Sequence, residues 1–443
     1  MSELYEVKEE MERVILVGVA TSDNDDTEVS MKELAELVKT AGAETLATVI
    51  QNREARHPGT YVGKGKIEEI RELCEQLGAT GIICDDELSP AQMKNLEDEL
   101  DCKVMDRTML ILDIFAQHAQ TKEGKLQVEL AQLKYRATRL IGRHRELSRV
   151  GGGSFGGGAG ASAGMGGGIG TRGPGEKKLE MDRRLIKDRI AQLNREIADV
   201  KKNREVARSL RERNPVPVVA IVGYTNAGKS TLLNTLTDAG ILAEDKLFAT
   251  LDPTTRGLAL ESGQQVLFTD TVGFIRKLPH HLIDAFRSTL EEAKYADLIL
   301  HIVDVSNPDV DAQMHIVYET LRDLGIQDKT IITAFNKQDL LPAEQTMKDL
   351  KADYTVKISA KHGKGIEELL NIVEKILREQ KKYVECVVPY AQAGVLQQIR
   401  KYGQLLSEEY TETGIAIKAY VPQDIYAKIE HQNMFGLSTT SCV

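Results

Sequence analysis

Residues 223–230 contain the residue types that bind a nucleotide phosphate. Their sequence, Gly-Tyr-Thr-Asn-Ala-Gly-Lys-Ser, has the pattern G-x-x-x-x-G-K-S and lies between an apolar, strand-like run (218–222) and a helical pattern (231–236). Glycines allow backbone N–H groups to surround a phosphate, and the positive end of the following helix attracts it. The Lys229 ammonium would reach the β- and γ-phosphate oxygens, and the Ser230 hydroxyl would coordinate magnesium. The pattern therefore predicts a P-loop that binds a nucleotide together with Mg2+.

A second segment predicts which base is bound. Residues 336–339 are Asn-Lys-Gln-Asp after a strand-like run, and this N-K-x-D resembles the guanine-recognition motif of the GTPase superfamily. The Asp339 carboxylate can accept hydrogen bonds from both N1–H and N2–H2 of guanine, whereas adenine would leave it unpaired. Lys337 would lie over the base plane, and Ser-Ala-Lys at 359–361 matches the superfamily's last guanine contact, a backbone N–H to O6. GTP and GDP are the predicted ligands.

Two further segments are expected to respond to the γ-phosphate. The strand-like run 265–270 leads into D-x-x-G, where Asp270 can hold magnesium through a water molecule and Gly273 allows backbone contact with the γ-phosphate. Residues 248–256 lie where the first switch is expected. A threonine there would bind magnesium only while the γ-phosphate is present, so the segment would order on GTP and relax on GDP. Three threonines compete for this role: Thr250, Thr254 and Thr255.

Two positions leave alternatives open. Phe274 follows D-x-x-G directly, where many small GTPases have a glutamine that orients the attacking water, and phenylalanine cannot hydrogen-bond. Either another side chain of the same domain substitutes, or intrinsic hydrolysis is slow and a partner completes the site, which we favour. Asn226 in the P-loop either helps to hold K+ beside the phosphates, as in potassium-dependent relatives, or only makes hydrogen bonds within the loop.

Composition and charge indicate a globular protein with one basic segment. The length of 443 residues suggests about three domains. No apolar run reaches the roughly 18 residues of a membrane span, so we expect none. The net charge is −10, but residues 121–213 contain 22 basic and 11 acidic residues, so this segment carries +11 and the remainder −21. The local excess predicts an anionic partner.

The start of the chain and its cysteines predict a cytoplasmic protein. Residues 1–4, Met-Ser-Glu-Leu, lack the basic region and apolar run of a secretory signal. The five cysteines form no C-x-x-C pair and no cluster with histidine at metal-binding spacing, so we expect free thiols in a reducing compartment. We also expect a monomer. The cysteines are Cys74, Cys84, Cys102, Cys386 and Cys442.

Residues 120–213 have the pattern of a helical hairpin. Apolar residues repeat every three or four positions from Leu126 to Leu147 and again from Ile186 to Val200, which predicts two helices zipped along a seam. The 20 residues between them at 151–170 include 12 glycines, so this loop should be mobile when free.

Basic side chains converge on the expected tip of this hairpin. A narrow, basic and flexible element could enter a nucleic-acid crevice, and the scarcity of aromatic residues favours backbone and shape recognition over base stacking. A solvated helical face is the alternative. The predicted RNA-binding residues are Arg136, Arg139, Arg143, Arg145, Arg149, Arg172, Lys177 and Lys178.

The expected fold class is α/β and multidomain: an N-terminal parallel α/β domain, an antiparallel helical hairpin with a glycine-rich tip, a P-loop GTPase domain and a small α+β C-terminal domain. Alternating strand and helix patterns in the first 119 residues predict the parallel sheet. The basic, glycine-rich segment 59–66 could contact phosphate but matches no phosphate-loop template, so we favour a surface loop. The predicted domains are 1–119, 120–213, 214–378 and 379–443.

Over nearly its full length the chain resembles the HflX family of ribosome-associated GTPases, within the Obg-HflX group. Beyond the nucleotide motifs, the resemblance lies in His-Pro-Gly-Thr-Tyr-Val-Gly-Lys-Gly-Lys at 57–66, in the stretch 106–115 that begins Asp-Arg-Thr, and in the glycine-rich hairpin. The family's F-A-T-L switch pattern, present at 248–251, favours Thr250 over the other two threonines. A hydrophobic residue after D-x-x-G is also a family trait, and Phe274 fits it.

The resemblance implies a partner that spacing alone does not identify. Family members bind the large ribosomal subunit and its rRNA, with the hairpin loop approaching the peptidyl-transferase centre, and are described as splitting or rescuing ribosomes under stress. We therefore expect a ribosome-stimulated GTP hydrolase that acts as a conformational switch. The alternatives are a GTP-regulated RNA-modifying enzyme, for which Cys442 is the only candidate residue, and a regulator that does not act on ribosomes.

These considerations define the predicted site. The catalytic residues are Lys229, Thr250 and Gly273, and the magnesium ligands are Ser230, Thr250 and, through water, Asp270. The nucleotide-binding set is Gly223, Tyr224, Thr225, Asn226, Ala227, Gly228, Lys229, Ser230, Thr231, Phe248, Ala249, Thr250, Leu251, Asp252, Asp270, Thr271, Val272, Gly273, Asn336, Lys337, Gln338, Asp339, Ser359, Ala360 and Lys361.

Overall fold

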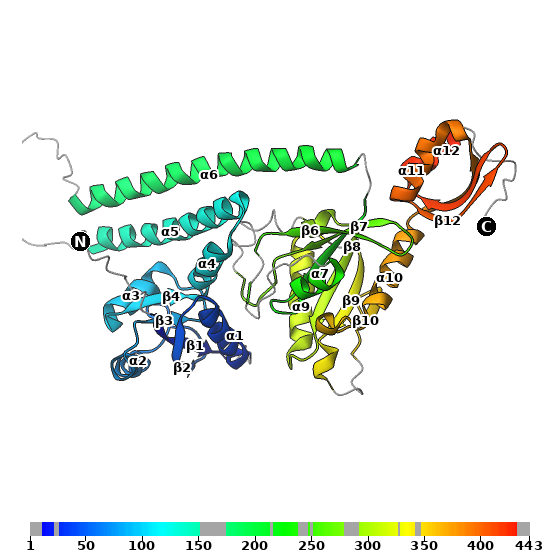
Figure 1. Cartoon of the computed structure of the whole chain (residues 1–443). Helices are drawn as coiled ribbons and strands as arrows, with labels where there is room; N and C mark the ends of the chain where they lie inside the picture. Colours follow the sequence, from blue (N-terminus) through cyan, green and yellow to red (C-terminus); the bar gives the residue numbers. More distant parts are fainter. Residues whose placement is uncertain are drawn as a thin grey trace, which may run out of the picture. The chain divides into compact units, whose positions relative to one another are not determined.

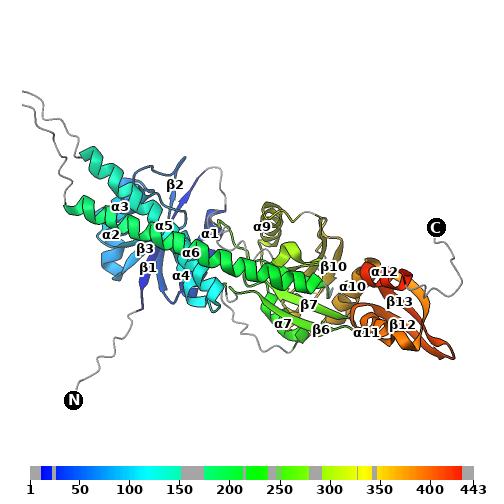
Figure 2. The same cartoon turned by 90° about the horizontal axis from the view of Figure 1, so that it is seen from above.

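The computed structural model forms two compact units. One comprises residues 1–200 and 277–285, and the other comprises residues 201–276 and 286–443. Figures 1 and 2 show their elements from two directions. The structure describes residues 11–21, 26–150, 174–212, 216–237, 247–248, 251–278, 292–326, 328–341 and 347–431.

A four-stranded parallel sheet forms the centre of the first unit, in the order β2-β1-β3-β4. Its central strands are almost entirely buried, because helices pack on a parallel sheet and leave no solvated face. The strands are β1 (Arg13–Ala20), β2 (Glu44–Asn52), β3 (Gly81–Cys84) and β4 (Lys103–Asp106), and the helices packed with them are α1 (Thr27–Thr40), α2 (Lys64–Leu77), α3 (Pro90–Leu100) and α4 (Arg107–His118).

Local capping fixes where two of these helices begin. Ser89 and Gln92 form a reciprocal capping box at the start of α3, where Pro90 occupies the first turn. Asp106, the last residue of β4, caps α4 by accepting a hydrogen bond from the Met109 N–H at 2.9 Å. The change from strand to helix at residue 106 therefore needs no connecting loop.

The glycine-rich segment 57–66 forms a turn that leads into α2. The His57 Nδ1 accepts hydrogen bonds from the Gly59 and Thr60 N–H groups at 3.3 and 3.1 Å. Tyr61 is buried, and its hydroxyl donates to Asp86 at 2.7 Å. The side chains of His57 and Tyr61 are therefore engaged within the unit, whereas Lys64 is exposed.

Two long helices form the predicted hairpin. α5 (Lys122–Val150) and α6 (Pro174–Glu212) run side by side in opposite directions (Figures 1 and 2). Leu193 is fully buried against Leu126 and Leu130, as the seam of apolar residues predicts. Beside this seam Arg189 forms two hydrogen bonds with the Glu129 carboxylate, at 2.7 and 2.9 Å. The predicted glycine-rich tip, residues 151–170, lies outside the described residues.

A six-stranded sheet forms the centre of the second unit, in the order β10-β9-β8-β5-β7-β6. Neighbouring strands are parallel except for β6, which is antiparallel to β7. One continuous apolar core joins the sheet to helices α7 and α10. The elements are β5 (Val218–Gly223), α7 (Lys229–Thr237), β6 (Thr254–Ala259), β7 (Gln265–Asp270), β8 (Leu298–Asp304), α9 (Val310–Asp323), β9 (Thr330–Asn336), β10 (Tyr354–Lys357) and α10 (Ile366–Glu379).

The last part of the second unit contains a three-stranded antiparallel sheet in the order β11-β13-β12. Two helices complete its separate apolar core. Strand β12 has a charged sequence, Gln-Leu-Leu-Ser-Glu-Glu-Tyr-Thr, without a long apolar run. These elements are β11 (Lys382–Val388), α11 (Ala393–Tyr402), β12 (Gln404–Thr411), β13 (Gly414–Val421) and α12 (Gln423–His431).

The predicted fold class is confirmed: the structure combines a parallel α/β sheet, a helical hairpin, a P-loop domain and a small α+β part. No helix within the described residues is both long and apolar enough to cross a bilayer. Four of the five cysteines lie in the described part of the chain, and each is a free thiol there.

Candidate nucleotide and magnesium site

Backbone geometry explains both glycines of the P-loop, residues 223–230. Gly223 has φ +155°, and a Cβ there would collide with the carbonyl oxygen of Ile302 on the neighbouring strand β8. Gly228 has φ +95°, and a Cβ there would collide with the Asn336 side-chain amide. Because the loop lies so close to β8 and β9, a side chain is excluded at both positions.

Lys229 is buried at the start of α7, with 7% of its surface exposed. Its ammonium donates to the Tyr224 carbonyl at 2.7 Å and to the Gly223 carbonyl at 3.3 Å. Burial lowers the pKa of Lys229 to about 8, and the nearby Asp270 carboxylate partly opposes this shift. A phosphate would supply the negative charge that a buried ammonium requires.

Ser230 and Asp270 provide oxygen ligands suited to magnesium. The Ser230 hydroxyl donates to Asp270 Oδ2 at 2.7 Å, so a hydroxyl from the P-loop and a carboxylate from the end of β7 lie side by side. Mg2+ prefers such oxygen ligands and retains several waters, so these residues fit a site in which Ser230 binds the ion and Asp270 holds one of its waters.

The D-x-x-G segment packs directly on the P-loop. A Cβ on Gly273 would lie 2.9 Å from the Lys229 Nζ and 2.9 Å from the Thr225 Cα. Thr271 fixes the segment from the other side, because its hydroxyl donates to the Ile221 carbonyl at 2.8 Å. Gly273 is therefore next to the lysine that would contact the terminal phosphates.

Phe274 has a structural role in this arrangement. Its ring is 2% exposed, and its backbone forms a parallel bridge with Tyr224 of the P-loop. An apolar, buried ring offers no group to orient a water, so the structure is consistent with the absence of the glutamine function at position 274.

Asn336 joins the P-loop to the second base-recognition segment. Its amide nitrogen donates to the Ala227 carbonyl at 2.9 Å, and its amide oxygen accepts from the Ala360 N–H at 2.9 Å. The side chain is 2% exposed. One amide thus connects the P-loop, through Ala227, with residues 359–361, through Ala360; these two partners lie 109 and 24 residues away from it in sequence.

Asp339 and Lys337 are held by neighbours in positions suited to a base. The Ser359 hydroxyl donates to Asp339 at 2.6 Å, and this hydrogen bond lowers the pKa of the Asp339 carboxyl, so it stays ionised and able to accept. Lys337 has a left-handed backbone (φ +64°), and its ammonium pairs with Asp304 at 2.7 Å.

The structure brings most of the predicted site residues together at the ends of β5, β7 and β9. Asn226 adopts φ +60° within the P-loop, Thr231 lies in the first turn of α7, and Val272 is buried beside Thr271. Gln338 and Lys361 belong to two 3-10 turns, Gln338–Leu340 and Ala360–His362.

The first switch is described only in part. Phe248 and Leu251 are buried and Asp252 is half-buried, whereas Ala249 and Thr250 lie outside the described residues. The competing threonines are in strand β6. Thr255 exchanges a hydrogen bond with the Thr269 hydroxyl at 2.9 Å, and Thr254 pairs with Asp270 in the strand register.

Two further residues, Asp304 and Arg276, are not indicated by the sequence motifs. Asp304 pairs with Lys337, and the Arg276 N–H donates a hydrogen bond to the Tyr224 hydroxyl at 2.9 Å. Asp304 ends the buried strand β8, and the carboxyl ends of parallel strands are where ligands bind, so its position carried a usable signal. No sequence pattern indicated the Tyr224 contact.

The predicted RNA-binding residues are described unevenly. Arg172 lies outside the described residues, and for Arg143, Arg145, Arg149, Lys177 and Lys178 the structure describes the helical backbone alone. Arg139 is engaged within its unit: its guanidinium pairs with the buried Asp106 at 2.7 Å and lies 3.2 Å from the centroid of the Tyr135 ring.

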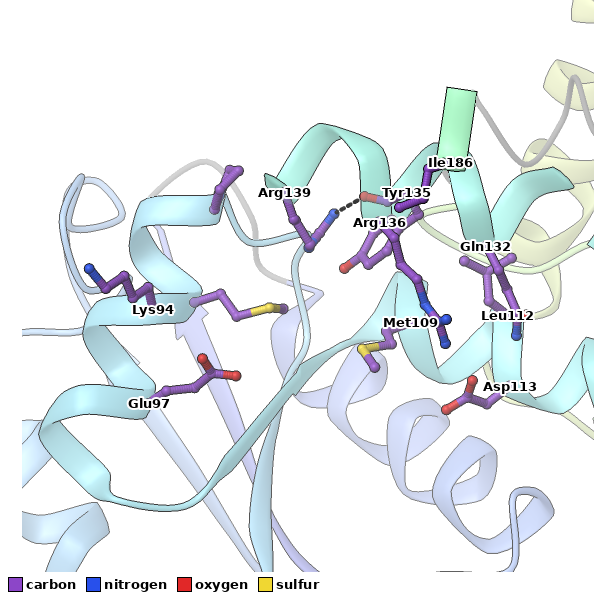
Figure 3. A pocket seen from close by; sticks show the side chains of 12 residues that line it. Lys94, Glu97, Met109, Leu112, Asp113, Gln132, Tyr135, Arg136, Arg139 and Ile186 are labelled. Atoms are coloured by element: carbon purple, nitrogen blue, oxygen red, sulfur yellow. Dashed lines mark hydrogen bonds between the residues drawn. The ribbon is translucent and has the colours of Figure 1, made fainter. Parts of the chain in front are cut away.

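A cavity of about 300 Å3 lies between α3, α4, α5 and α6 in the first unit (Figure 3). Its wall is largely apolar, with Met109, Leu112 and Ile186 among the residues labelled in the figure. Arg136 and Arg139 also line it, and Arg139 donates to the Tyr135 carbonyl at 3.5 Å. Arg136 is exposed.

Comparison with known proteins gives a consistent result along the chain. Three family models match: "GTP-binding GTPase N-terminal" at residues 28–116, "GTP-binding GTPase Middle Region" at 118–211 and "50S ribosome-binding GTPase" at 218–337.

Curated relatives match over almost the whole length. A protein of Lacrimispora saccharolytica named GTPase HflX is 64% identical over 97% of this chain and 98% of its own. The GTPase HflX of Caldanaerobacter subterraneus is 46% identical over 97% of this chain and 95% of its own, and that of Escherichia coli is 42% identical over 83% of each chain.

Proposed function

Because the chain belongs to the HflX family of GTPases, we propose that it binds the large ribosomal subunit and uses GTP hydrolysis as a conformational switch in splitting or rescuing ribosomes under stress. The protein is a GTP hydrolase. The proposed partner is supported by the family description "50S ribosome-binding GTPase" and by the basic helical hairpin of residues 120–213.

The proposed roles of the site residues follow from their contacts. Lys229 would exchange its two carbonyl partners for phosphate oxygens, and its charge would stabilise the transferred phosphoryl group. Ser230, Asp270 by way of a water, and Thr250 are the proposed residues of the magnesium site. Bound Mg2+ would neutralise phosphate charge. Gly273 would donate its N–H to the γ-phosphate, so GTP and GDP would hold the D-x-x-G segment differently.

Guanine selection is proposed to depend on Asp339, which is ionised and held by Ser359. Its two carboxylate oxygens match the two neighbouring donors of guanine. The Lys337–Asp304 ion pair would set the lysine stem against the base plane. The Ala360 N–H is already bonded to Asn336 and the Ser359 N–H to the Lys364 carbonyl, so the guanine O6 contact would come from the Lys361 N–H.

The basic hairpin is the proposed contact with rRNA. Each phosphate neutralised by lysine or arginine releases counterions, so binding should weaken steeply with salt. The proposed contacts are Arg136, Arg143, Arg145, Arg149, Arg172, Lys177 and Lys178. Reversing the charge of Arg139 would leave the buried Asp106 carboxylate without its cation, so its loss would disturb the fold as well as any RNA contact.

The buried Phe274 supports a partner that completes the catalytic site. The phenylalanine at position 274 cannot orient the attacking water. We therefore propose that intrinsic hydrolysis is slow and that the large subunit stimulates it. A single-turnover assay with and without the subunit tests this, and equal rates would reject it.

A cytoplasmic location and a potassium requirement belong to the same proposal. The proposed ribosomal partner requires the cytoplasmic location. Asn226, which has φ +60° inside the P-loop, is the candidate residue for holding K+. Equal hydrolysis rates in Na+ and K+ would reject the potassium requirement while leaving the remainder of the proposal intact.

Sedimentation with purified large subunits tests the partner and the hairpin together. The chain bound to a non-hydrolysable GTP analogue should co-sediment with subunits in a salt-sensitive manner, and the GDP form should not. Deleting residues 151–170, or combining Arg143→Glu with Arg145→Glu, should abolish co-sedimentation.

The matched control combines Lys201→Glu with Lys202→Glu, on the same hairpin. These exposed residues lie 27 positions or more from the start of α6, on the order of 40 Å along the helix. The control should retain binding. Equal loss in both double variants would indicate general charge attraction, and no sedimentation of the unmodified chain would refute the partner.

A further inference from the structure

The backbone at Phe274 forms an isolated parallel bridge with the P-loop. The Thr225 N–H donates to the Phe274 carbonyl at 2.8 Å, and the Phe274 N–H donates to the Gly223 carbonyl at 3.1 Å. Together these bonds form the parallel bridge between Tyr224 and Phe274. The segment that should respond to the γ-phosphate is therefore docked on the loop that should hold the phosphates.

One side chain extends this pairing beyond the backbone. Tyr224 is buried, with 4% of its surface exposed, and its hydroxyl oxygen accepts a hydrogen bond from the Arg276 N–H at 2.9 Å. Arg276 is itself 7% exposed. The phenol thus holds the far end of the segment, three residues beyond Gly273, in a region that excludes water.

The position of Gly273 depends on this docking. Gly273 fits so closely against Thr225 and the Lys229 ammonium that an added Cβ would lie 2.9 Å from each. Its backbone is anchored on one side by Thr271, bonded to Ile221, and on the other by the Phe274 bridge and Tyr224. A segment fixed at both ends presents the Gly273 N–H without first having to be ordered, and such preorganisation is a direct contribution to affinity.

We propose that the Tyr224 hydroxyl is a positioning group that holds Gly273 ready for the γ-phosphate, and that it thereby sets the preference of this protein for GTP over GDP. Tyr224 acts through the backbone at residues 273–276. GDP lacks the phosphate that Gly273 would contact, so the hydroxyl should matter for GTP alone. This inference rests on GTP binding by the chain and is independent of the proposed ribosomal partner.

Tyr224→Phe removes one oxygen atom and keeps the buried ring. In purified protein with Mg2+, we expect the affinity for a non-hydrolysable GTP analogue to fall by about five-fold, the fold-change of one neutral hydrogen bond, while the GDP affinity stays the same. The Michaelis constant for GTP should rise accordingly. Equal weakening of both nucleotides, or no change in either, would overturn the proposal.

Tyr318→Phe is the matched control in the same unit. Its hydroxyl is also partly buried and donates to Asp349 at 2.6 Å, but neither residue belongs to the phosphate-binding segments. This variant should lower thermal stability and leave the ratio of analogue to GDP affinity unchanged. If it changed that ratio as Tyr224→Phe does, the effect would come from general loosening of the domain and the proposal would fail.

Hydrogen exchange on the unmodified protein tests the geometry without any variant. The amides of Thr225, Phe274 and Arg276 should be protected in the nucleotide-free chain, because all three are donors in the contacts above. Exchange of the Arg276 amide at the rate of an open loop would contradict the proposal even if Tyr224→Phe failed to fold.

Discussion

Replacing Asn336 by alanine should weaken guanine nucleotide binding strongly, because a single buried amide connects two nucleotide-binding segments. The change removes the donor to the Ala227 carbonyl and the acceptor for the Ala360 N–H, each at 2.9 Å. Both backbone groups then lose a buried partner.

The expected magnitude follows from these two contacts. Leaving a buried polar group unsatisfied costs roughly 1–3 kcal/mol, so two groups cost roughly 2–6 kcal/mol. Water reaching the emptied space would place the result near the lower limit. About 2 kcal/mol corresponds to a loss of about 30-fold in GDP affinity if the whole cost appears in binding.

Isothermal titration with GDP at fixed Mg2+, combined with thermal unfolding of the nucleotide-free protein, separates loss of affinity from loss of stability. Asn307→Ala is a suitable control, because Asn307 also makes a side-chain hydrogen bond to the backbone, accepting from the Asp309 N–H at 2.9 Å, outside the base-recognition segments. A change in GDP affinity of less than about three-fold for Asn336→Ala, with unaltered stability, would refute the reasoning.

Three other variants or conditions test separate parts of the structure. Asp304→Asn removes the charge that pairs with Lys337 at 2.7 Å, and GDP affinity should fall by about three- to ten-fold with kcat unchanged; an altered kcat at an unaltered Michaelis constant would contradict this role. Burial lowers the pKa of Lys229 to about 8, so the free protein holds this lysine partly neutral at pH 8, and phosphate binding should restore its proton. Titration calorimetry of nucleotide binding in two buffers of different ionisation enthalpy should show uptake of about half a proton at pH 8, falling towards zero near pH 6.5. The absence of proton uptake at both pH values would contradict the lowered pKa of Lys229. The same burial means that the charged Lys229 lowers the free energy of unfolding below pH 8. This loss of stability should decrease as the pH rises from about 8 towards 10.5, the ordinary pKa of lysine. Leu193→Ala opens a cavity in the hairpin seam and should cost about 2–5 kcal/mol of stability in that region, seen as faster amide exchange in α5 and α6 without a change in GDP affinity; unchanged exchange would show that the seam does not stabilise the hairpin.

The sequence was informative wherever local pattern and chemistry coincide. The P-loop has a fixed order of strand, glycine loop and helix, and the structure has β5, residues 223–230 and α7 in that order. The hairpin seam was predictable for the same reason. Leu126 and Leu130 belong to an apolar repeat at helical spacing in α5, Leu193 belongs to a second such repeat in α6, and the three side chains meet in the structure.

Contacts between distant segments were not predictable in this way. The Asn336 amide was expected as part of N-K-x-D, but its two partners lie 109 and 24 residues away, and nothing local indicates such distances. Tyr224 was expected to contribute only as a member of the P-loop, and its side-chain bond to Arg276 depends on how two loops pack.

Charge density alone does not show how each basic side chain is engaged. The sequence predicts that Arg139 binds RNA because it lies in a basic run, and in the structure its guanidinium pairs with a carboxylate at the end of β4. Sequence shows where charges are dense, whereas only tertiary packing shows which of them are already paired.

The most direct test of the proposed switch measures nucleotide affinity with and without saturating large ribosomal subunits. If the GTP form binds the subunit more tightly than the GDP form, reciprocity requires the subunit to raise the affinity for a GTP analogue, relative to GDP, by the same factor. We predict that the subunit tightens analogue binding at least about ten-fold more than GDP binding. Equal effects on both nucleotides, or none on either, would contradict the account.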